Sequence, residues 1–119
     1  MAILVSFDID GTLESGDPRG PITMDIVRNA ESHGCIIGSS SDRPLPVQQA
    51  IWDRHNIHVS FVSNKQHLLD LKSRFPAKDY YHVGDTALDR QFALAAGFNF
   101  VWMDDGSTEP WINGTAQQD

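Results

Sequence analysis

The sequence predicts an α/β protein with a Rossmann-like, three-layer, doubly wound sheet of five parallel strands and helices on both faces. Five short apolar runs, rich in β-branched and aromatic residues, occur along the 119 residues. Segments with apolar residues at helical spacing lie between them. Gly, Asp or Ser residues close most of the runs. This alternation is typical of βα units, whose crossovers are right-handed by default.

The predicted strands are apolar on both faces, as expected for strands buried in a parallel sheet. The first follows Met1 directly, and the lack of a basic segment before it distinguishes it from a secretory signal peptide. We place the five strands at residues 2–7, 35–37, 59–62, 80–83 and 98–103.

Four helices are predicted between these strands, and local residues mark their ends. Thr23 is a suitable N-cap for the first helix, Pro46 fits the first turn of the second, and Pro76 stops the third. Gly residues follow the first and fourth helices, where a left-handed backbone commonly ends a helix. The helices are expected at about residues 23–33, 46–55, 65–75 and 87–96.

One domain is expected, because 119 residues match the usual size of a single domain. We assign residues 1–104 to its core and residues 105–119 to a loosely held C-terminal tail, anchored by Trp111. A single cysteine excludes an internal disulfide, which favours a reducing, cytoplasmic setting.

The chain is acidic, with nine Lys and Arg against sixteen Asp and Glu and a net charge of −7. A nucleic-acid backbone and an anionic membrane surface both attract clustered positive charge, so neither is expected as a partner. No apolar run approaches the roughly 20 residues of a membrane span. The acidic balance fits a general gain in solubility or a set of acids that bind a metal.

Two acidic pairs follow predicted strands. Asp8 and Asp10 come after the first strand, and Asp85 and Asp89 come after the fourth. Each pair alone also fits an ordinary turn or a helix start. In an open parallel sheet, however, these strand ends share the edge at which ligands bind. Up to four carboxylates at one edge suit Mg²⁺, and no His or Cys spacing supports zinc.

Two further features at this edge favour an anionic ligand. Ser39, Ser40 and Ser41 follow the second strand, and their hydroxyls and backbone amides can hold phosphate oxygens, although a Ser-rich turn is the simpler interpretation. Lys65 lies at a helix start, where the helix dipole disfavours a cation unless an anion is near. Lys72 is the alternative cation, but it lies within a predicted helix, away from the strand ends.

Together these residues resemble the haloacid dehalogenase-like hydrolases, and the chain looks like a small member without a cap domain. The family's motifs occur in order here: DxDGT at residues 8–12, a strand-end Ser, a Lys, and GDxxxD at residues 84–89. The resemblance implies a phosphoric monoester hydrolase that needs Mg²⁺ and acts on a phosphorylated substrate. It makes residues 1–104 the catalytic core.

The same resemblance implies a role for each acid. Asp8 is the nucleophile and forms an aspartyl-phosphate. Asp10 is the general acid that protonates the leaving oxygen and then the base that activates water. Mg²⁺ is held by Asp8, the backbone carbonyl of Asp10 and Asp85, and it screens the anionic nucleophile from the anionic substrate.

The resemblance also implies contacts to the phosphate. Ser41 is preferred over Ser39 and Ser40, because residues 41–44, SDRP, resemble the family's [ST]-G-R-P segment, although Asp42 replaces its Gly. The remaining implied roles are phosphate binding by Lys65, Gly11 and Thr12, support of the metal or of Lys65 by Asp89, and substrate contact by Arg43.

No segment is long enough to form a cap over this edge. Residues 11–22 leave room only for a short flap, and nothing is inserted between residues 62 and 65. The site is therefore expected to be open on one side. An open site suits a bulky substrate, or a neighbouring subunit of a homo-oligomer that acts as a lid.

A non-catalytic phosphate-binding or signalling module is the alternative function. Receiver domains also combine a five-stranded sheet, an acid pair and a Lys. They need a phosphate-accepting Asp after the third strand, where this chain has Ser63, Asn64 and Lys65. A binding protein that keeps the site without turnover is a further alternative, which tight phosphate and Mg²⁺ binding in the absence of hydrolysis would support.

Overall fold

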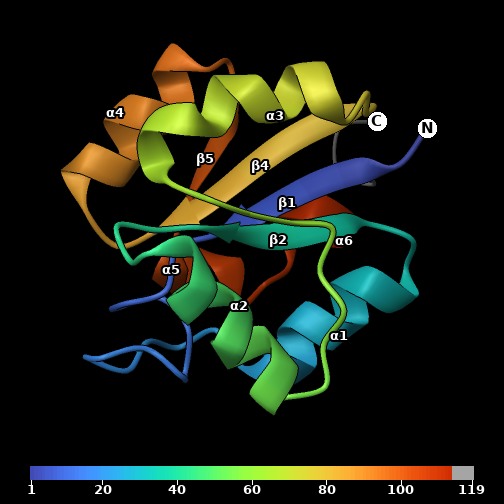
Figure 1. Cartoon of the computed structure of the whole chain (residues 1–119). Coiled ribbons are helices and arrows are strands. Elements are labelled where there is room, and N and C mark those ends of the chain that lie inside the picture. The colour runs from blue at the N-terminus through green and yellow to red at the C-terminus, as the bar shows by residue number, and fades with distance from the viewer. Residues whose placement is uncertain (114–119) are drawn as a thin grey trace.

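One sheet of five parallel strands forms the centre of the molecule. Its strands are β1 Ile3–Phe7, β2 Ile36–Ser40, β3 Phe61–Ser63, β4 Asp79–Gly84 and β5 Asn99–Trp102. The computed structural model describes residues 1–113 and shows the strands in the order β3-β2-β1-β4-β5 (Figure 1). β1 is central and pairs with β2 on one side and β4 on the other. The predicted parallel α/β fold is confirmed.

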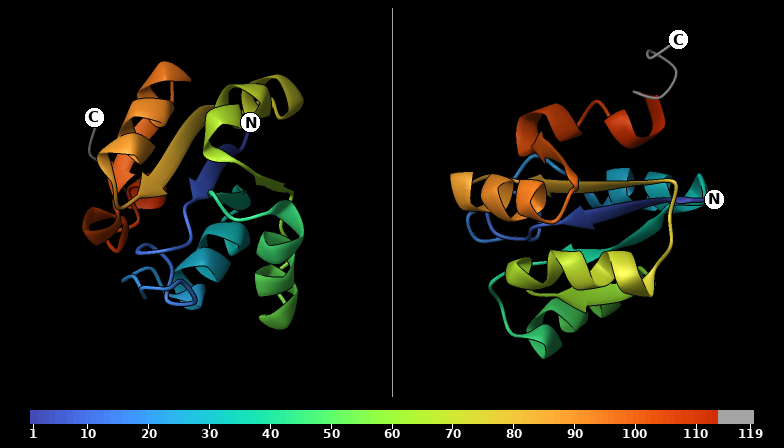
Figure 2. Two further views of the ribbon diagram at one scale, coloured as in Figure 1. Left: turned by 60° about the vertical axis from the view of Figure 1, so that its left-hand side comes forward. Right: turned by 90° about the horizontal axis from the view of Figure 1, so that it is seen from above.

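Helices form one layer on each face of the sheet. They are α1 Met24–Ser32, α2 Leu45–Arg54, a 3₁₀-helix at Lys65–His67, α3 Leu68–Arg74, α4 Ala87–Ala95, α5 Met103–Gly106 and α6 Pro110–Asn113. Figure 1 shows α3 and α4 on one face and α1, α2 and α5 on the other, and the left view of Figure 2 shows the strands between these layers. None of the helices within residues 1–113 is long and apolar enough to cross a membrane.

The alternation of side chains along β1 divides the apolar core between the two layers. Val5 and Phe7 pack in the same cluster as Val27 of α1. Leu4, which points to the opposite face, packs in the cluster that contains Leu71 of α3. β1 is therefore buried on both faces, as its continuous apolar run predicted.

The helix ends follow the local signals in the sequence. The side chain of Thr23 caps α1 by accepting a hydrogen bond of 3.2 Å from the backbone N–H of Ile26. Gly34 follows α1 with a φ of +87°, and Gly97 follows α4 with a φ of +78°. Pro46 lies in the first turn of α2. These ends depend on local backbone chemistry, which is why short-range sequence signals find them.

β2 continues beyond the predicted strand end at residue 37. Ser39 lies opposite Phe7 of β1 and Val62 of β3, and Ser40 lies opposite Ser63. Ser39 and Ser40 therefore belong to the strand and not to the loop after it. Ser39 is paired on both sides and Ser40 with β3, and this non-local pairing outweighs the preference of a Ser-rich segment for a turn.

The segment expected to be a loose tail contains two short helices, α5 and α6. The anchoring side chain is Trp111, which is 1% exposed and packs edge-on against Phe7 with 5.6 Å between the ring centroids. Gly106 is also buried, because its backbone lies against Ile22 and Val83. Residues 114–119 of the predicted tail lie outside the described residues.

We expect Trp111→Ala to lower the free energy of unfolding by about 3 kcal/mol or more, because it leaves a cavity beside Phe7. The matched control is Trp102→Ala, whose side chain is 40% exposed, and which should lose about 1 kcal/mol. Urea unfolding followed by fluorescence measures both. Equal losses in the two variants would show that the C-terminal helices do not depend on this anchor.

Candidate functional site

Strand order brings the two acidic motifs together. Asp8 follows β1 and Asp85 follows β4, and these strands are neighbours in the sheet. Phe7 lies opposite Val83, and the backbone N–H of Asp8 donates to the carbonyl of Val83 over 2.9 Å. The parallel ladder thus continues up to Asp8, and it fixes the start of both loops at the same edge.

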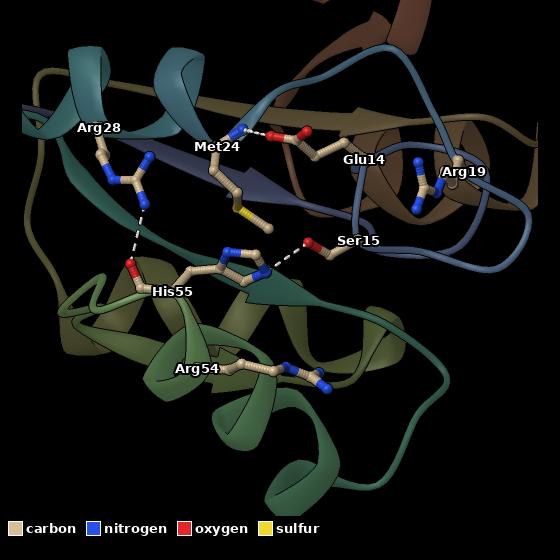
Figure 3. A pocket seen from close by; sticks show the side chains of 7 residues that line it. All are labelled: Glu14, Ser15, Arg19, Met24, Arg28, Arg54 and His55. Atoms are coloured by element: carbon tan, nitrogen blue, oxygen red, sulfur yellow. Dashed lines mark hydrogen bonds between the residues drawn. The ribbon is translucent and has the colours of Figure 1, made fainter.

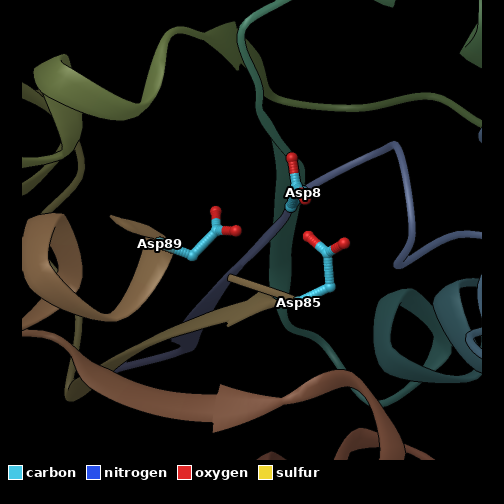
Figure 4. A group of neighbouring side chains, drawn as sticks. All are labelled: Asp8, Asp85 and Asp89. Atoms are coloured by element: carbon cyan, nitrogen blue, oxygen red, sulfur yellow. The ribbon is translucent and has the colours of Figure 1, made fainter. Parts of the chain in front are cut away.

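Three aspartates converge at this edge. One carboxylate oxygen each from Asp8, Asp85 and Asp89 lies within 4.8 Å of the others, and Figure 4 shows the three side chains facing a common centre. Asp8 and Asp89 are buried and Asp85 is half-buried. Burying like charges so close together is unfavourable unless protons or cations compensate. The cluster could therefore hold a metal ion.

Two glycines make room for these carboxylates. Gly11 has a φ of +76°, and a Cβ on it would lie 1.9 Å from Oδ2 of Asp85. A Cβ on Gly84 would lie 2.4 Å from Cγ of Asp89. Any larger residue would displace a carboxylate of the cluster. The Gly in each motif is therefore a steric requirement of the acids beside it.

Lys65 is the cation that faces the cluster. Its side chain is 6% exposed, and its Nζ lies 3.5 Å from Asp8, 3.2 Å from Asp89 and 3.7 Å from Asp42. The charges of Asp8 and Asp89 raise the pKa of Lys65 despite the opposing effect of burial. Lys72, the competing lysine, instead has its Nζ 3.5 Å from the carbonyl of Gly97.

Asp89 is fixed by its helix and by a histidine. It closes a capping box with Thr86 at the start of α4. Its Oδ1 lies 2.9 Å from Nε2 of His82, whose Nδ1 lies 3.0 Å from the hydroxyl of Ser6. The Ser6 hydroxyl in turn donates to Ser40 over 2.7 Å. A buried polar chain thus links the cluster to the interior of the sheet.

This polar chain is the part of the site that sequence reasoning missed. His82 lies within β4 and is fully buried, where sequence alone indicates only a packed side chain. Ser6 and His82 lie opposite each other in the β1–β4 register and therefore share a face. The available signal was a pair of polar residues in two apolar strands. Only the register, which is not local, shows that they meet.

The two buried carboxyls titrate in opposite directions. Burial raises the pKa of Asp8 from 3.8 to about 8, together with the charge of Asp89 and the neighbouring Asp85, while Lys65 partly offsets the rise. Burial also acts to raise the pKa of Asp89, but the hydrogen bond and charge of His82 and the charge of Lys65 lower it to about 2. Asp89 is therefore the charged partner of Lys65, and Asp8 is the acid whose ionisation is unfavourable.

Asp10 lies apart from the three-aspartate cluster. Its carboxylate accepts two hydrogen bonds from the Arg43 guanidinium, at 2.7 and 3.0 Å, and one of 2.8 Å from the backbone N–H of Asp17. The Arg43 hydrogen bonds hold the pKa of Asp10 below its usual value, although partial burial opposes them. Arg43 thus contacts an acid of the chain itself.

The three serines lie in different surroundings. The Ser39 hydroxyl donates to Gln48 over 2.7 Å and accepts from Trp52 Nε1 over 3.0 Å. It is therefore buried between the sheet and α2. Ser40 accepts from Ser6 within the polar chain. Only Ser41 of the three lies beyond β2, where its hydroxyl accepts from the backbone N–H of Arg43 over 3.1 Å.

Thr12 joins the cluster from the opposite side of Asp8. Its hydroxyl donates to Oδ2 of Asp8 over 3.3 Å, whereas Lys65 approaches Oδ1. Thr12 and Lys65 therefore approach different oxygens of Asp8. The carboxylate, hydroxyl and backbone oxygens of this edge are hard ligands of the type that suits Mg²⁺.

Comparison with known protein families and with curated proteins finds no match for this chain.

We expect metal-free protein to lose stability as the pH rises from about 4 to about 8, because folded Asp8 holds its proton and unfolded Asp8 does not. Asp8→Asn should remove this loss and unfold with a free energy higher by at least about 1.4 kcal/mol at pH 8, the equivalent of one pKa unit. Denaturant unfolding in EDTA measures it. The exposed control Asp104→Asn should follow the wild type, and an unchanged pH dependence in Asp8→Asn would contradict the result.

We expect Arg43→Gln to raise the pKa of Asp10, because it removes the guanidinium that stabilises the carboxylate. Carboxyl ¹³C NMR of the metal-free protein measures this pKa directly. Arg90→Gln removes an exposed arginine from α4 and should leave the Asp10 titration unchanged. An Asp10 pKa that stays low in Arg43→Gln would show that the Asp17 N–H holds the charge alone.

Proposed function

We propose that this protein is a Mg²⁺-dependent phosphatase that hydrolyses a phosphomonoester through an aspartyl-phosphate on Asp8. The observation that carries the proposal is the convergence of Asp8, Asp85, Asp89 and Lys65 at the carboxyl edge of the sheet. The resemblance of the DxDGT and GDxxxD motifs to the haloacid dehalogenase-like hydrolases supports it. The natural substrate is a phosphate ester not yet identified.

The residues of the cluster fit a divalent cation. They present only oxygen ligands, and the space beside Asp85 exists because residue 11 has no Cβ. Lys65 alone supplies one positive charge against three carboxyls. Asp8, Asp85 and the backbone carbonyl of Asp10 would hold the ion. When bound, Mg²⁺ supplies positive charge that screens the nucleophile from the phosphate.

In the first step, a carboxylate oxygen of Asp8 attacks phosphorus, and the ester P–O bond breaks. Asp10 gives its proton to the leaving oxygen, which departs as an alcohol. Lys65 lies 3.5 Å from the nucleophilic carboxylate and stabilises negative charge on the transferring group. Thr12, on the other Asp8 oxygen, keeps the carboxylate oriented.

In the second step, water attacks the phosphorus of the aspartyl-phosphate, and the bond between phosphorus and Asp8 breaks. Asp10, now ionised, accepts a proton from the water, so inorganic phosphate leaves and both acids return to their starting forms. The Arg43 pair favours the ionised form of Asp10, which suits this second step. Protonation of Asp10 for the first step requires that the pair with Arg43 loosens when substrate binds.

The sheet order supports the phosphatase over a receiver-like module. Receivers use the order 2-1-3-4-5, whereas this chain has the order 3-2-1-4-5. Ser63 and Asn64 occupy the place after β3 where a receiver needs its accepting aspartate. Lys65 instead lies beside Asp8, after the central strand β1, and beside Asp89 of α4.

We expect the purified protein to hydrolyse p-nitrophenyl phosphate in the presence of Mg²⁺ and to stop when EDTA removes the ion. Asp8→Asn should lower kcat/KM by roughly 1,000-fold or more, because it removes the proposed nucleophile. Asp104→Asn serves as the matched acidic control and should keep its activity. Equal turnover by wild type and Asp8→Asn after rigorous purification would exclude this function.

A further inference from the structure

A hollow lies away from the aspartates, between the flap (residues 11–22), α1 and the C-terminal end of α2. It has a volume of about 520 Å³, within the range typical of small-molecule sites. Three of the nine basic residues of the chain, Arg19, Arg28 and Arg54, line it together with His55. Figure 3 shows Arg19 on the flap, Arg28 on α1 and Arg54 at the end of α2, with the Arg28 guanidinium directed toward His55. We call this hollow the arginine pocket.

The arginine pocket concentrates positive charge in a chain whose net charge is −7. Arg28 is paired with Asp25 at 3.0 Å. Arg19 and Arg54 form no ion pair with any residue of the described range 1–113. Because acids outnumber bases by sixteen to nine, two arginines that line one hollow without an acidic partner among the described residues are available to an anion from outside the chain.

The acid that does line the pocket is already engaged. The Glu14 carboxylate accepts a hydrogen bond from the backbone N–H of Met24, at the start of α1. It therefore satisfies a donor of the helix N-terminus. Glu14 thus leaves Arg19 and Arg54 free to bind an external anion.

Hydrogen bonds hold the walls of the pocket together. The hydroxyl of Ser15, in the flap, lies 2.9 Å from Nε2 of His55, after α2. The guanidinium of Arg28, on α1, donates to the backbone carbonyl of His55 over 3.0 Å. All three segments therefore meet at His55. Such cross-linking preorganises a site and reduces the entropy lost on binding.

We infer that the arginine pocket binds a small molecule that carries a phosphate dianion. Guanidinium groups pair with phosphate oxygens through parallel hydrogen bonds, and Arg19, Arg54 and His55 can approach one such group from separate segments. The site is distinct from the aspartate cluster, since none of its lining residues belongs to that cluster. Binding there requires neither magnesium nor hydrolysis, so the inference goes beyond the proposed phosphatase.

The flap connects the arginine pocket to Asp10, the general acid and base of the proposed reaction. Ser15 and Arg19 line the pocket, and the backbone N–H of Asp17 between them donates to Asp10. The backbone N–H of Gly11 also donates to the carbonyl of Pro18 over 2.7 Å. An anion held by Arg19 therefore acts on the same loop that positions Asp10.

Inorganic pyrophosphate in EDTA is the probe, and calorimetry together with ¹H–¹⁵N NMR of the full chain is the measurement. We expect one saturable site, with amide shifts centred on Ser15, Arg28 and His55. Arg19→Gln and Arg54→Gln should each weaken binding about tenfold, equivalent to about 1.4 kcal/mol. Arg90→Gln should bind as the wild type does. Asp85→Asn, which removes a proposed metal ligand, should also bind pyrophosphate normally. The experiment therefore tests the arginine pocket independently of the proposed phosphatase.

Three results would overturn the inference. They are the absence of saturable binding, equal affinity in wild type, Arg19→Gln and Arg54→Gln, and amide shifts centred on residues 8–12 and 85–89. Succinate, titrated in the same way, tests the ligand class, and an affinity equal to that of pyrophosphate would overturn the assignment to phosphate. Thermal unfolding of each variant checks that the fold is intact. We expect unchanged unfolding, because the exposed Arg19 and Arg54 side chains contribute little to packing.

Discussion

The burial of Asp8 against two other carboxyls is the constraint on which this edge of the molecule depends. Asp89 is held in its charged form by His82 and Lys65, so the shortage of positive charge falls on Asp8. The folded chain alone meets this shortage by keeping a proton on Asp8. A divalent cation would meet it instead by stabilising the ionised form, which is the form that can attack phosphorus. The same electrostatic cost would favour metal binding and, in the proposed reaction, a reactive nucleophile.

The fold can maintain these closely spaced carboxyls because a different element fixes each part of the cluster. The β1–β4 ladder continues into Asp8, the capping box of α4 fixes Asp89, and the polar chain through His82 and Ser6 supports Asp89 from within the sheet. Rigid support of this kind lets a domain of 119 residues keep unfavourable charges at fixed positions without a large surrounding structure.

The parts of this architecture that sequence predicts are those set by local chemistry or by general topology. Thr23 and Gly34 bound α1 through caps that need only neighbouring residues. The meeting of Asp8 with Asp85 follows from the rule that parallel strands end at a common edge. The sequence could not predict that Ser39 and Ser40 belong to β2, because partners on both sides decide a strand's length. The Asp10–Arg43 pair was likewise hidden, since it joins two loops 33 positions apart.

In the proposed phosphatase, the flap is the element that would give the open edge its selectivity. Because no cap covers this edge within residues 1–113, discrimination among phosphate esters in the proposed reaction depends on residues around the opening. The flap supplies Thr12 to the nucleophile, the Asp17 N–H to Asp10 and Ser15 to the wall of the arginine pocket. An anion that engages Arg19 would contact the same short loop whose Asp17 N–H donates to Asp10. In the proposed reaction, anion recognition and proton transfer would therefore share the flap.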